Sequence, residues 1–297
     1  MDVIAQVIVL FLLMFFGFIS NKARLIPAEG IAGLNKLVVW FALPCLMISK
    51  LQQDVDPALA RDLAAVFVLG GITIVLFGFL AHAVVFRGEE PSRRAVFASM
   101  SFFPNAGYMG FPVLNAAFGP DNLIYCVMYV AIFNLLGWSI GVLIFDRSAL
   151  DLRKLLKVPS LIAAVIGIIL FVLKVHLPGV LVDTMETMGS VTTPLAMFVI
   201  GTRLTEVRMS DLRDVKLLIA CALRLLVFPV ICWALLTVLG FGGLVRAVVT
   251  LCTAMPCAAQ VAIQAENYGG DGVLASRCVA VSTLLSIATI PVILLLV

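Results

Sequence analysis

The chain has 297 residues, of which 63% are hydrophobic and 12% are charged, and its formal net charge is +3. Soluble domains are about 45–50% apolar and about 25% charged, so this composition excludes a soluble globular protein and indicates an integral protein of the lipid bilayer. The small net charge argues against nucleic acid as a partner. The seven cysteines lie in apolar segments without CxxC spacing, so we expect no disulfide framework, metal site or cofactor.

Apolar stretches of about 20 residues, the length that crosses a bilayer, follow one another along almost the whole chain. Charge clusters and Gly, Pro and Asp turns separate ten of them, so we predict ten transmembrane helices. The first lacks a preceding basic region and a cleavage site, so we interpret it as a membrane helix and not a signal peptide. The predicted spans are 3–20, 31–50, 63–86, 95–117, 122–145, 158–175, 184–205, 214–239, 247–268 and 273–296.

Lys and Arg residues orient the chain, because the cytoplasmic loops of membrane proteins hold an excess of them. If the N-terminus is outside, fourteen of the twenty fall in inside loops, and only Lys50, Arg61, Lys174 and Arg246 fall in outside loops. We therefore predict a multi-pass protein of the cell (inner) membrane with both termini on the outer, periplasmic side.

The chain resembles itself at a shift of about half its length. The triplet "RAV" at 94–96 recurs at 246–248, and a mid-span proline follows each copy at the same interval, Pro104 in the first and Pro256 in the second. Such internal similarity indicates a structural repeat.

The two repeat units are 1–148 and 149–297, with five predicted spans each. Five is an odd number, so the second unit enters the membrane from the opposite side and the repeat is inverted. Secondary transporters use inverted repeats to build outward-open and inward-open states around a site in mid-membrane, although channels also contain repeats. The predicted fold is an all-α membrane protein with ten transmembrane helices in two inverted five-helix repeats.

The fourth span contains several helix breakers in the stretch "PNAGYMGFP". Pro104 and Pro112 each remove a backbone donor, and Gly107 and Gly110 lie between them. Freed backbone groups in hydrocarbon need partners from protein or water. We therefore predict an unwound segment between two half-helices.

The ninth span carries the counterpart "TAMPCAAQVAIQ", with Pro256 and the polar Gln260 but no glycine. We expect a break here as well, milder than the first. Ordinary kinks would account for either segment alone, but matching positions in two repeats are typical of a transporter binding site. Two broken helices that cross in mid-membrane point half-helix N-termini at one place, where their partial positive charge can hold a carboxylate.

Polar residues inside the other spans have two interpretations each. Arg224 lies about ten residues, or about 15 Å, inside the eighth span, and it either attracts an anion beside a cavity or packs between helices. Asn134 in the fifth span either contributes to the site or bonds to a neighbouring helix. All seventeen acidic residues lie in loops or near span ends. This argues against a cation/proton antiporter and leaves a coupling ion, H⁺ or Na⁺, unassigned.

Five motifs, in family order, resemble the auxin efflux carrier family of membrane transporters, which includes plant auxin exporters and bacterial malonate or malate permeases. They are "LVVWFALPCLMISKL", "PNAGYMGFPVL", "TPLAMFVIGTRL", "AMPCAAQVAIQAENYGGD" and "STLLSIATIP". The resemblance implies a scaffold like that of sodium/proton antiporters and bile-acid symporters, with broken helices 4 and 9 that cross at the substrate. It also leaves a homodimer as a candidate assembly. The loop 146–157 is short where many plant members have a long one, which favours a bacterial carrier.

We therefore predict a secondary membrane transporter that moves a small organic carboxylate anion by alternating access. The alternative is a channel or a ligand-binding membrane sensor on the same scaffold. We do not expect an enzyme, because the spans contain no nucleophile–base pair or metal-ligand cluster. The expected helix-breaking residues are Pro104, Pro112 and Pro256. The expected substrate-binding residues are Asn105, Gly107, Tyr108, Gly110, Pro112, Asn134, Arg224, Pro256 and Gln260.

Overall fold

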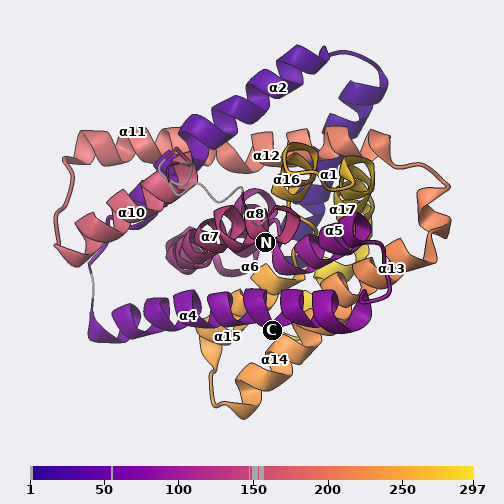
Figure 1. The fold of residues 1–297 in the computed structure, drawn as a ribbon. Coiled ribbons are helices and arrows are strands. Elements are labelled where there is room, and N and C mark those ends of the chain that lie inside the picture. Colours follow the sequence, from indigo (N-terminus) through magenta and orange to yellow (C-terminus); the bar gives the residue numbers. More distant parts are fainter. Residues whose placement is uncertain (1–2, 55, 147, 149–152, 154–156) are drawn as a thin grey trace.

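The computed structural model describes residues 3–54, 56–146, 148, 153 and 157–297 (Figure 1). Within these residues the regular secondary structure is helical, as the composition predicts. A single isolated antiparallel bridge, between Pro104 and Cys257, is the exception among them.

The helices are named in chain order. Those before residue 146 are α1 (Val3–Lys22), α2 (Ala28–Leu37), α3 (Leu43–Lys50), α4 (Pro57–Leu80), α5 (Pro91–Phe102), α6 (Phe111–Phe118), α7 (Leu123–Trp138) and α8 (Ile140–Phe145). Those after residue 157 are α10 (Pro159–Val172), α11 (Gly179–Ser190), α12 (Thr192–Arg203), α13 (Val215–Ala222), α14 (Phe228–Val238), α15 (Gly243–Ala254), α16 (Ala259–Asn267) and α17 (Gly272–Leu294). Four π-helical turns connect some of them: η1 (Val38–Ala42), η2 (Ala81–Val85), η3 (Ala106–Gly110) and η7 (Leu223–Val227).

Aspartates fix where several of the long apolar helices begin. The carboxylates of Asp56, Asp214 and Asp271 accept hydrogen bonds from backbone N–H groups three residues later, at 2.7, 3.2 and 2.8 Å. Each of these side chains satisfies a donor that the first helical turn leaves unpaired. They define the first turns of α4, α13 and α17, each of which leads into an apolar run.

Helices occupy all ten predicted spans, and the protein is a multi-pass membrane protein. Six continuous helical stretches among the described residues are long and apolar enough to cross a bilayer. Of the other predicted spans, 95–117, 184–205 and 247–268 are each divided into two helices, and 158–175 contains a shorter apolar helix. The number of crossings, the division into units 1–148 and 149–297 and the inverted relation between them stay predictions. The six stretches are Ala5–Lys22, Ala28–Lys50, Pro57–Val85, Pro120–Phe145, Val215–Val238 and Gly272–Leu294.

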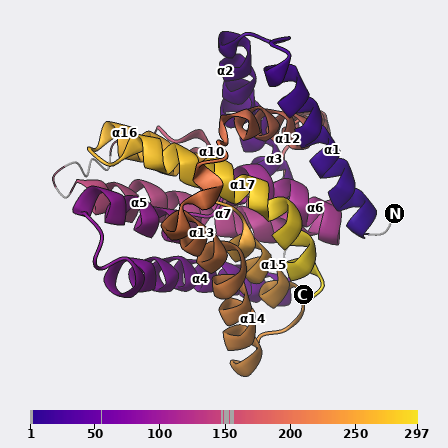
Figure 2. The same ribbon diagram turned by 90° about the vertical axis from the view of Figure 1, so that its right-hand side faces the viewer.

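The helices pack in two groups. Group A comprises α1, α2, α3, α10, α11 and α12, in which α1 packs along α12 and α3 packs against both α10 and α11. Group B comprises α4 to α8 and α13 to α17, in which α4 contacts α5, α7 and α15, and α16 packs on α17. Figures 1 and 2 show α2 and α12 on the side of the molecule opposite α4 and α14.

The contact between α1 and α12 depends on two glycines. A Cβ atom on Gly17 would lie 2.0 Å from the carbonyl oxygen of Phe198, and one on Gly201 would lie 1.9 Å from that of Met14. Small residues let helix backbones approach closely, which is a major source of helix association in membranes. Within group A, α1 and α12 are therefore in direct backbone contact.

Both predicted breaks are present, and they lie against each other. The chain leaves the helical conformation at Phe103–Asn105 after α5 and at Met255–Ala258 after α15. The N–H of Asn105 donates to the carbonyl of Pro256 at 2.7 Å, and the N–H of Ala258 donates to the carbonyl of Phe103 at 3.0 Å. Pro104 faces Cys257 in the antiparallel bridge. The two breaks thus supply each other with the partners that hydrocarbon cannot.

Two details of the breaks differ from expectation. The second break is four residues long against three for the first, although it contains no glycine, so it is not the milder of the two. The bridge between Pro104 and Cys257 and its two flanking hydrogen bonds involve residues of both breaks, so both segments leave the helical conformation where they pair. Pro112 lies near the start of α6, inside continuous helical structure, and the wide turn η3 precedes it.

Candidate functional site

A cavity of about 480 Å³ lies where the two breaks face group A. Its walls come from α2, η1, α3, α12 and the start of α10 on one side, and from η3, α7, α16 and α17 on the other. Most lining side chains are apolar, with a small number of amides, hydroxyls and cations among them. This is the usual make-up of a small-molecule site.

Five of the predicted binding residues line this cavity: Asn105, Gly107, Tyr108, Asn134 and Gln260. The other four do not. Gly110 and Pro112 are buried in packing behind the cavity wall, Pro256 accepts the hydrogen bond from Asn105, and Arg224 lies behind the breaks.

Asn105 is held by three sets of hydrogen bonds at the first break. Its N–H reaches Pro256, and its carbonyl oxygen accepts from the N–H groups of Met109 and Gly110. Its side-chain Oδ1 accepts from the N–H of Tyr108 at 3.4 Å, which caps the start of η3. The amide Nδ2 has no hydrogen bond within the described part of the chain, so it is a donor available to a ligand.

Tyr108 joins the two groups of helices. It belongs to η3 in group B, and its hydroxyl donates to Oδ1 of Asn35 in α2 of group A at 2.5 Å. Its ring is half-buried in the cavity wall. The contact runs across the boundary between the groups, beside the cavity.

Gln260 lies in the first turn of α16, the half-helix that follows the second break. Its Nε2 is buried and has no partner among the described residues. A Cβ atom on Gly137 of α7 would come within 2.7 Å of this nitrogen, so a side chain there would displace the amide of Gln260. One turn later, the Nε2 of Gln264 donates to the carbonyl of Gly137 at 2.6 Å. The lack of a side chain at Gly137 therefore leaves space for Gln260, and the carbonyl of Gly137 holds Gln264 in place.

Free backbone donors also face the cavity. The N–H groups of Gly107, Ala259 and Gln260 belong to the first turns of η3 and α16, and they have no hydrogen-bond acceptor among the described residues. Unpaired N–H groups at a helix N-terminus carry partial positive charge and are a ready site for an anion. The two breaks place two such termini on one cavity.

The charged residues of the cavity lining are cations. Arg203, half-buried at the end of α12, and the exposed Lys157 line the cavity, and no carboxylate does. No ion pair is formed by Arg203 within the described residues. Neither cation was among the expected binding residues. The signal for Arg203 was its spacing, because Val199, Ile200 and Arg203 lie on one helix face and all three line the cavity.

Arg224 is almost fully buried, with 1% of its surface exposed. Its Nε donates to the carbonyl of Met255 at 3.0 Å, and its Nη1 donates to the carbonyl of Ser101 at 2.9 Å. Ser101 lies in the last turn of α5, and Met255 follows α15. Of the two interpretations of this residue, the geometry matches packing between helices.

Asn134 faces the cavity but also bonds within its own helix, since its Nδ2 donates to the carbonyl of Val130 at 3.0 Å. In the second unit, the hydroxyl of Ser282 accepts from the N–H of Cys257 at 3.0 Å, so α17 holds the second break in place. Thr283 lines the cavity beside it.

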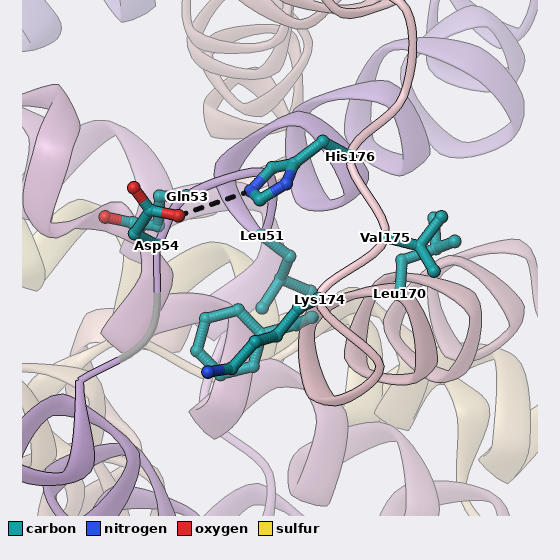
Figure 3. A pocket seen from close by; sticks show the side chains of 8 residues that line it. Leu51, Gln53, Asp54, Leu170, Lys174, Val175 and His176 are labelled. Atoms are coloured by element: carbon teal, nitrogen blue, oxygen red, sulfur yellow. Dashed lines mark ion pairs between the residues drawn. The ribbon is translucent and has the colours of Figure 1, made fainter.

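A second hollow lies between residues 51–54 and residues 170–176, which comprise the end of α10 and the segment after it (Figure 3). An ion pair of 3.6 Å between His176 and Asp54 closes one side of it. With a volume of about 10 Å³ it is no larger than a water site. No group of three or more metal-ligating side chains is present in the described part of the chain.

Comparison with known proteins places the chain in a family. The model of the membrane transport protein family matches residues 2–151 and 148–294. A protein of Methanothermobacter thermautotrophicus named only as an uncharacterized transporter is 28% identical over 98% of this chain and 96% of its own length. A protein of Rhizobium meliloti, provisionally named a malonate transporter, is 25% identical over 97% of this chain and 94% of its own length.

A plant relative covers a smaller part. Auxin efflux carrier component 8 of Arabidopsis thaliana is 25% identical over 50% of this chain and 41% of its own length. The family expected from the sequence motifs is thereby confirmed. The chain belongs to the membrane transport protein family, the family of the auxin efflux carriers.

Proposed function

We propose that the protein is a secondary transporter that moves a small organic carboxylate across the cell membrane by alternating access. The observation that carries the proposal is the cavity at the two breaks, which is lined by two cations, unpaired amide and backbone donors, and no carboxylate. The positive charge of such a site attracts an anion, and its donors can replace the hydrogen bonds that the anion loses when it leaves water.

The carboxylate binds between the half-helix N-termini in this proposal. Its oxygens accept hydrogen bonds from Asn105 Nδ2 and Gln260 Nε2 and from the N–H groups of Gly107 and Ala259, all of which lie at the cavity. Hydrogen bonds to a charged acceptor contribute about 1.5–3 kcal/mol each. Arg203 and Lys157 raise the local anion concentration electrostatically.

Alternating access follows from the two packing groups. Group B moves against group A, and the cavity between them opens to one side of the membrane at a time. Lys157 and Arg203 fall in predicted cytoplasmic loops, so the cavity lined by them corresponds to the inward-facing state. The hydrogen bond from Tyr108 to Asn35 crosses the moving boundary and must break or be exchanged in each cycle.

The inverted repeat, with units 1–148 and 149–297, supplies the second state. In this proposal helices 4 and 9 cross at Pro104 and Pro256, and exchanging the conformations of the two units gives the outward-facing cavity. Both termini lie on the periplasmic side. The name of the Rhizobium meliloti relative supports a small carboxylate as substrate and a dicarboxylate such as malonate as the first to test. The proposal needs no coupling ion, and a homodimer is the candidate assembly.

Uptake into proteoliposomes tests the site. Asn105→Ala and Gln260→Ala are each expected to raise the KM for carboxylate uptake. Asn122→Ala and Gln53→Ala are matched controls, because these side chains bond only to nearby carbonyls, away from the cavity. Unchanged uptake in both site variants would refute the site, and ion currents faster than carrier turnover would identify a channel instead.

A further inference from the structure

The buried guanidinium of Arg224 connects the two helix breaks from behind. It projects from the π-helical turn η7 of the eighth span, and its two hydrogen bonds end on α5 and on the residue after α15. Its third nitrogen, Nη2, is buried without a partner in the described part of the chain. Both bonded carbonyls belong to half-helix C-termini.

Without Arg224, these two carbonyls would be buried without this hydrogen-bond partner, which costs free energy. The last carbonyls of a helix lack intrahelical partners and carry partial negative charge. In the membrane interior no water is available to pair with them. A guanidinium presents its N–H groups in a planar fork with fixed spacing, so one Arg side chain can bind two separate carbonyls at once.

The bonded carbonyls are close in sequence to the groups that form the site. Met255 directly precedes Pro256, whose carbonyl accepts the hydrogen bond from Asn105. Ser101 lies two residues before Phe103, whose carbonyl accepts from Ala258. Arg224 is therefore attached to both sides of the paired breaks, within two residues of each inter-break hydrogen bond.

We propose that Arg224 is a positioning residue that clamps the two breaks together through the carbonyls of Ser101 and Met255 and thereby sets the spacing of the anion-binding donors. It does not contact the substrate, because it does not line the cavity. Arg203 supplies the cation that faces the ligand, and Arg224 supplies the cation that neutralises the half-helix C-termini. The clamp rests on the structure of the breaks, and only its effect on transport rests on the proposed function.

Hydrogen exchange of the backbone amides tests the clamp without any substrate. Amides that open locally exchange in proportion to the population of the open form. Arg224→Gln is expected to speed exchange at Asn105 and Ala258 at least about tenfold, which corresponds to about 1.4 kcal/mol. Arg224→Lys keeps the charge but lacks the fork, so it should rescue part of the protection. Arg203→Gln is the matched control and should leave exchange at the breaks as in the wild type.

The location of the effect decides between clamp and general destabilisation. The clamp predicts faster exchange confined to peptides around the two breaks, with α1 and α12 unchanged. Exchange that rises equally in all helices, or that stays at the wild-type rate at both breaks in the Lys and Gln variants, would overturn the proposal. If Arg224→Gln does not fold, Arg224→Lys carries the same test.

Uptake kinetics separate the clamp from the proposed function. Arg224→Gln and Arg203→Gln should both raise the KM for carboxylate uptake, but only the former should change exchange at the breaks. Faster exchange in Arg224→Gln with wild-type uptake would support the clamp and refute the proposed binding site. Unchanged exchange with impaired uptake would refute the clamp and leave the transport proposal standing.

Discussion

The N–H of Asn105 and the carbonyl of Pro256, from opposite halves of the chain, form a hydrogen bond of 2.7 Å. Each residue lies beside or at a proline that ends a helix in mid-span. Because each break pairs with the other, the chain can leave the helical conformation in mid-span and direct two half-helix N-termini, with their free N–H groups, at one cavity.

Introducing a negative charge at Asn105 should abolish anion binding. Asn105→Asp places a carboxylate among the donors that are proposed to hold the substrate carboxylate, and like charges at close range repel. Asn105→Ala only removes a donor, and we expect about a 10- to 100-fold rise in the dissociation constant. Equilibrium binding to purified protein measures both. An Asp variant that binds as tightly as the Ala variant would contradict this position for the ligand.

Arg203 should act through long-range attraction. Arg203→Gln is expected to raise the KM for uptake several-fold, and the difference from wild type should shrink as salt is added, because added ions screen partly exposed charges. Uptake measured across a range of ionic strength checks this. A defect that does not depend on salt would mean that Arg203 acts by direct contact or by packing.

We expect Gly137 to affect ligand binding through the position of the Gln260 side chain. Gly137→Ala puts a methyl group 2.7 Å from Gln260 Nε2, and the flexible glutamine must move out of its place at the cavity. Affinity should fall in the single variant, but Gly137→Ala should cause little further loss in a Gln260→Ala background, because the two changes act on the same contact. A double-mutant cycle of ligand binding tests this, and additive losses would show that Gly137 acts elsewhere.

We expect a side chain at Gly201 to destabilise the contact between α1 and α12 in group A. Gly201→Ala brings a Cβ atom to 1.9 Å from a backbone oxygen of α1, which cannot move unless the helices separate. Overpacking typically costs about 1–3 kcal/mol, so the melting temperature in detergent should fall. Gly33→Ala is the matched control, since a Cβ there meets no atom within 4 Å. Equal melting temperatures for the two variants would contradict the close contact between α1 and α12.

Local features of the site were predictable from sequence, and long-range ones were not. Prolines at matching positions predicted the breaks at Pro104 and Pro256, because a proline inside a helix removes a backbone donor and clashes with the preceding turn. The antiparallel pairing of the second break with the first, by contrast, is a contact between distant segments. Pro112 stays helical because the wide turn η3 precedes it, which no single residue signals.

The cationic residues at and behind the cavity show the same limit of prediction from the sequence. The sequence shows how deep Arg224 lies in its span but not which groups it contacts, so two interpretations of this residue stayed open. Arg203 and Lys157 were counted as loop charges, and only the packing of α10 and α12 around the breaks brings them to the cavity. The amide residues Asn105 and Gln260 were found because they lie one and four residues after the prolines of the breaks.

The most direct test of the account is a thermal-shift titration of the wild type and the Asn105→Ala/Gln260→Ala double variant with acetate, malonate, succinate and malate. A ligand that binds only the native state raises the melting temperature, and the stabilisation grows with the logarithm of its concentration above the dissociation constant. The account predicts that at least one of these carboxylates stabilises the wild type and that the double variant loses this stabilisation. Equal stabilisation of both proteins, or none of the wild type by any of the four, would contradict it.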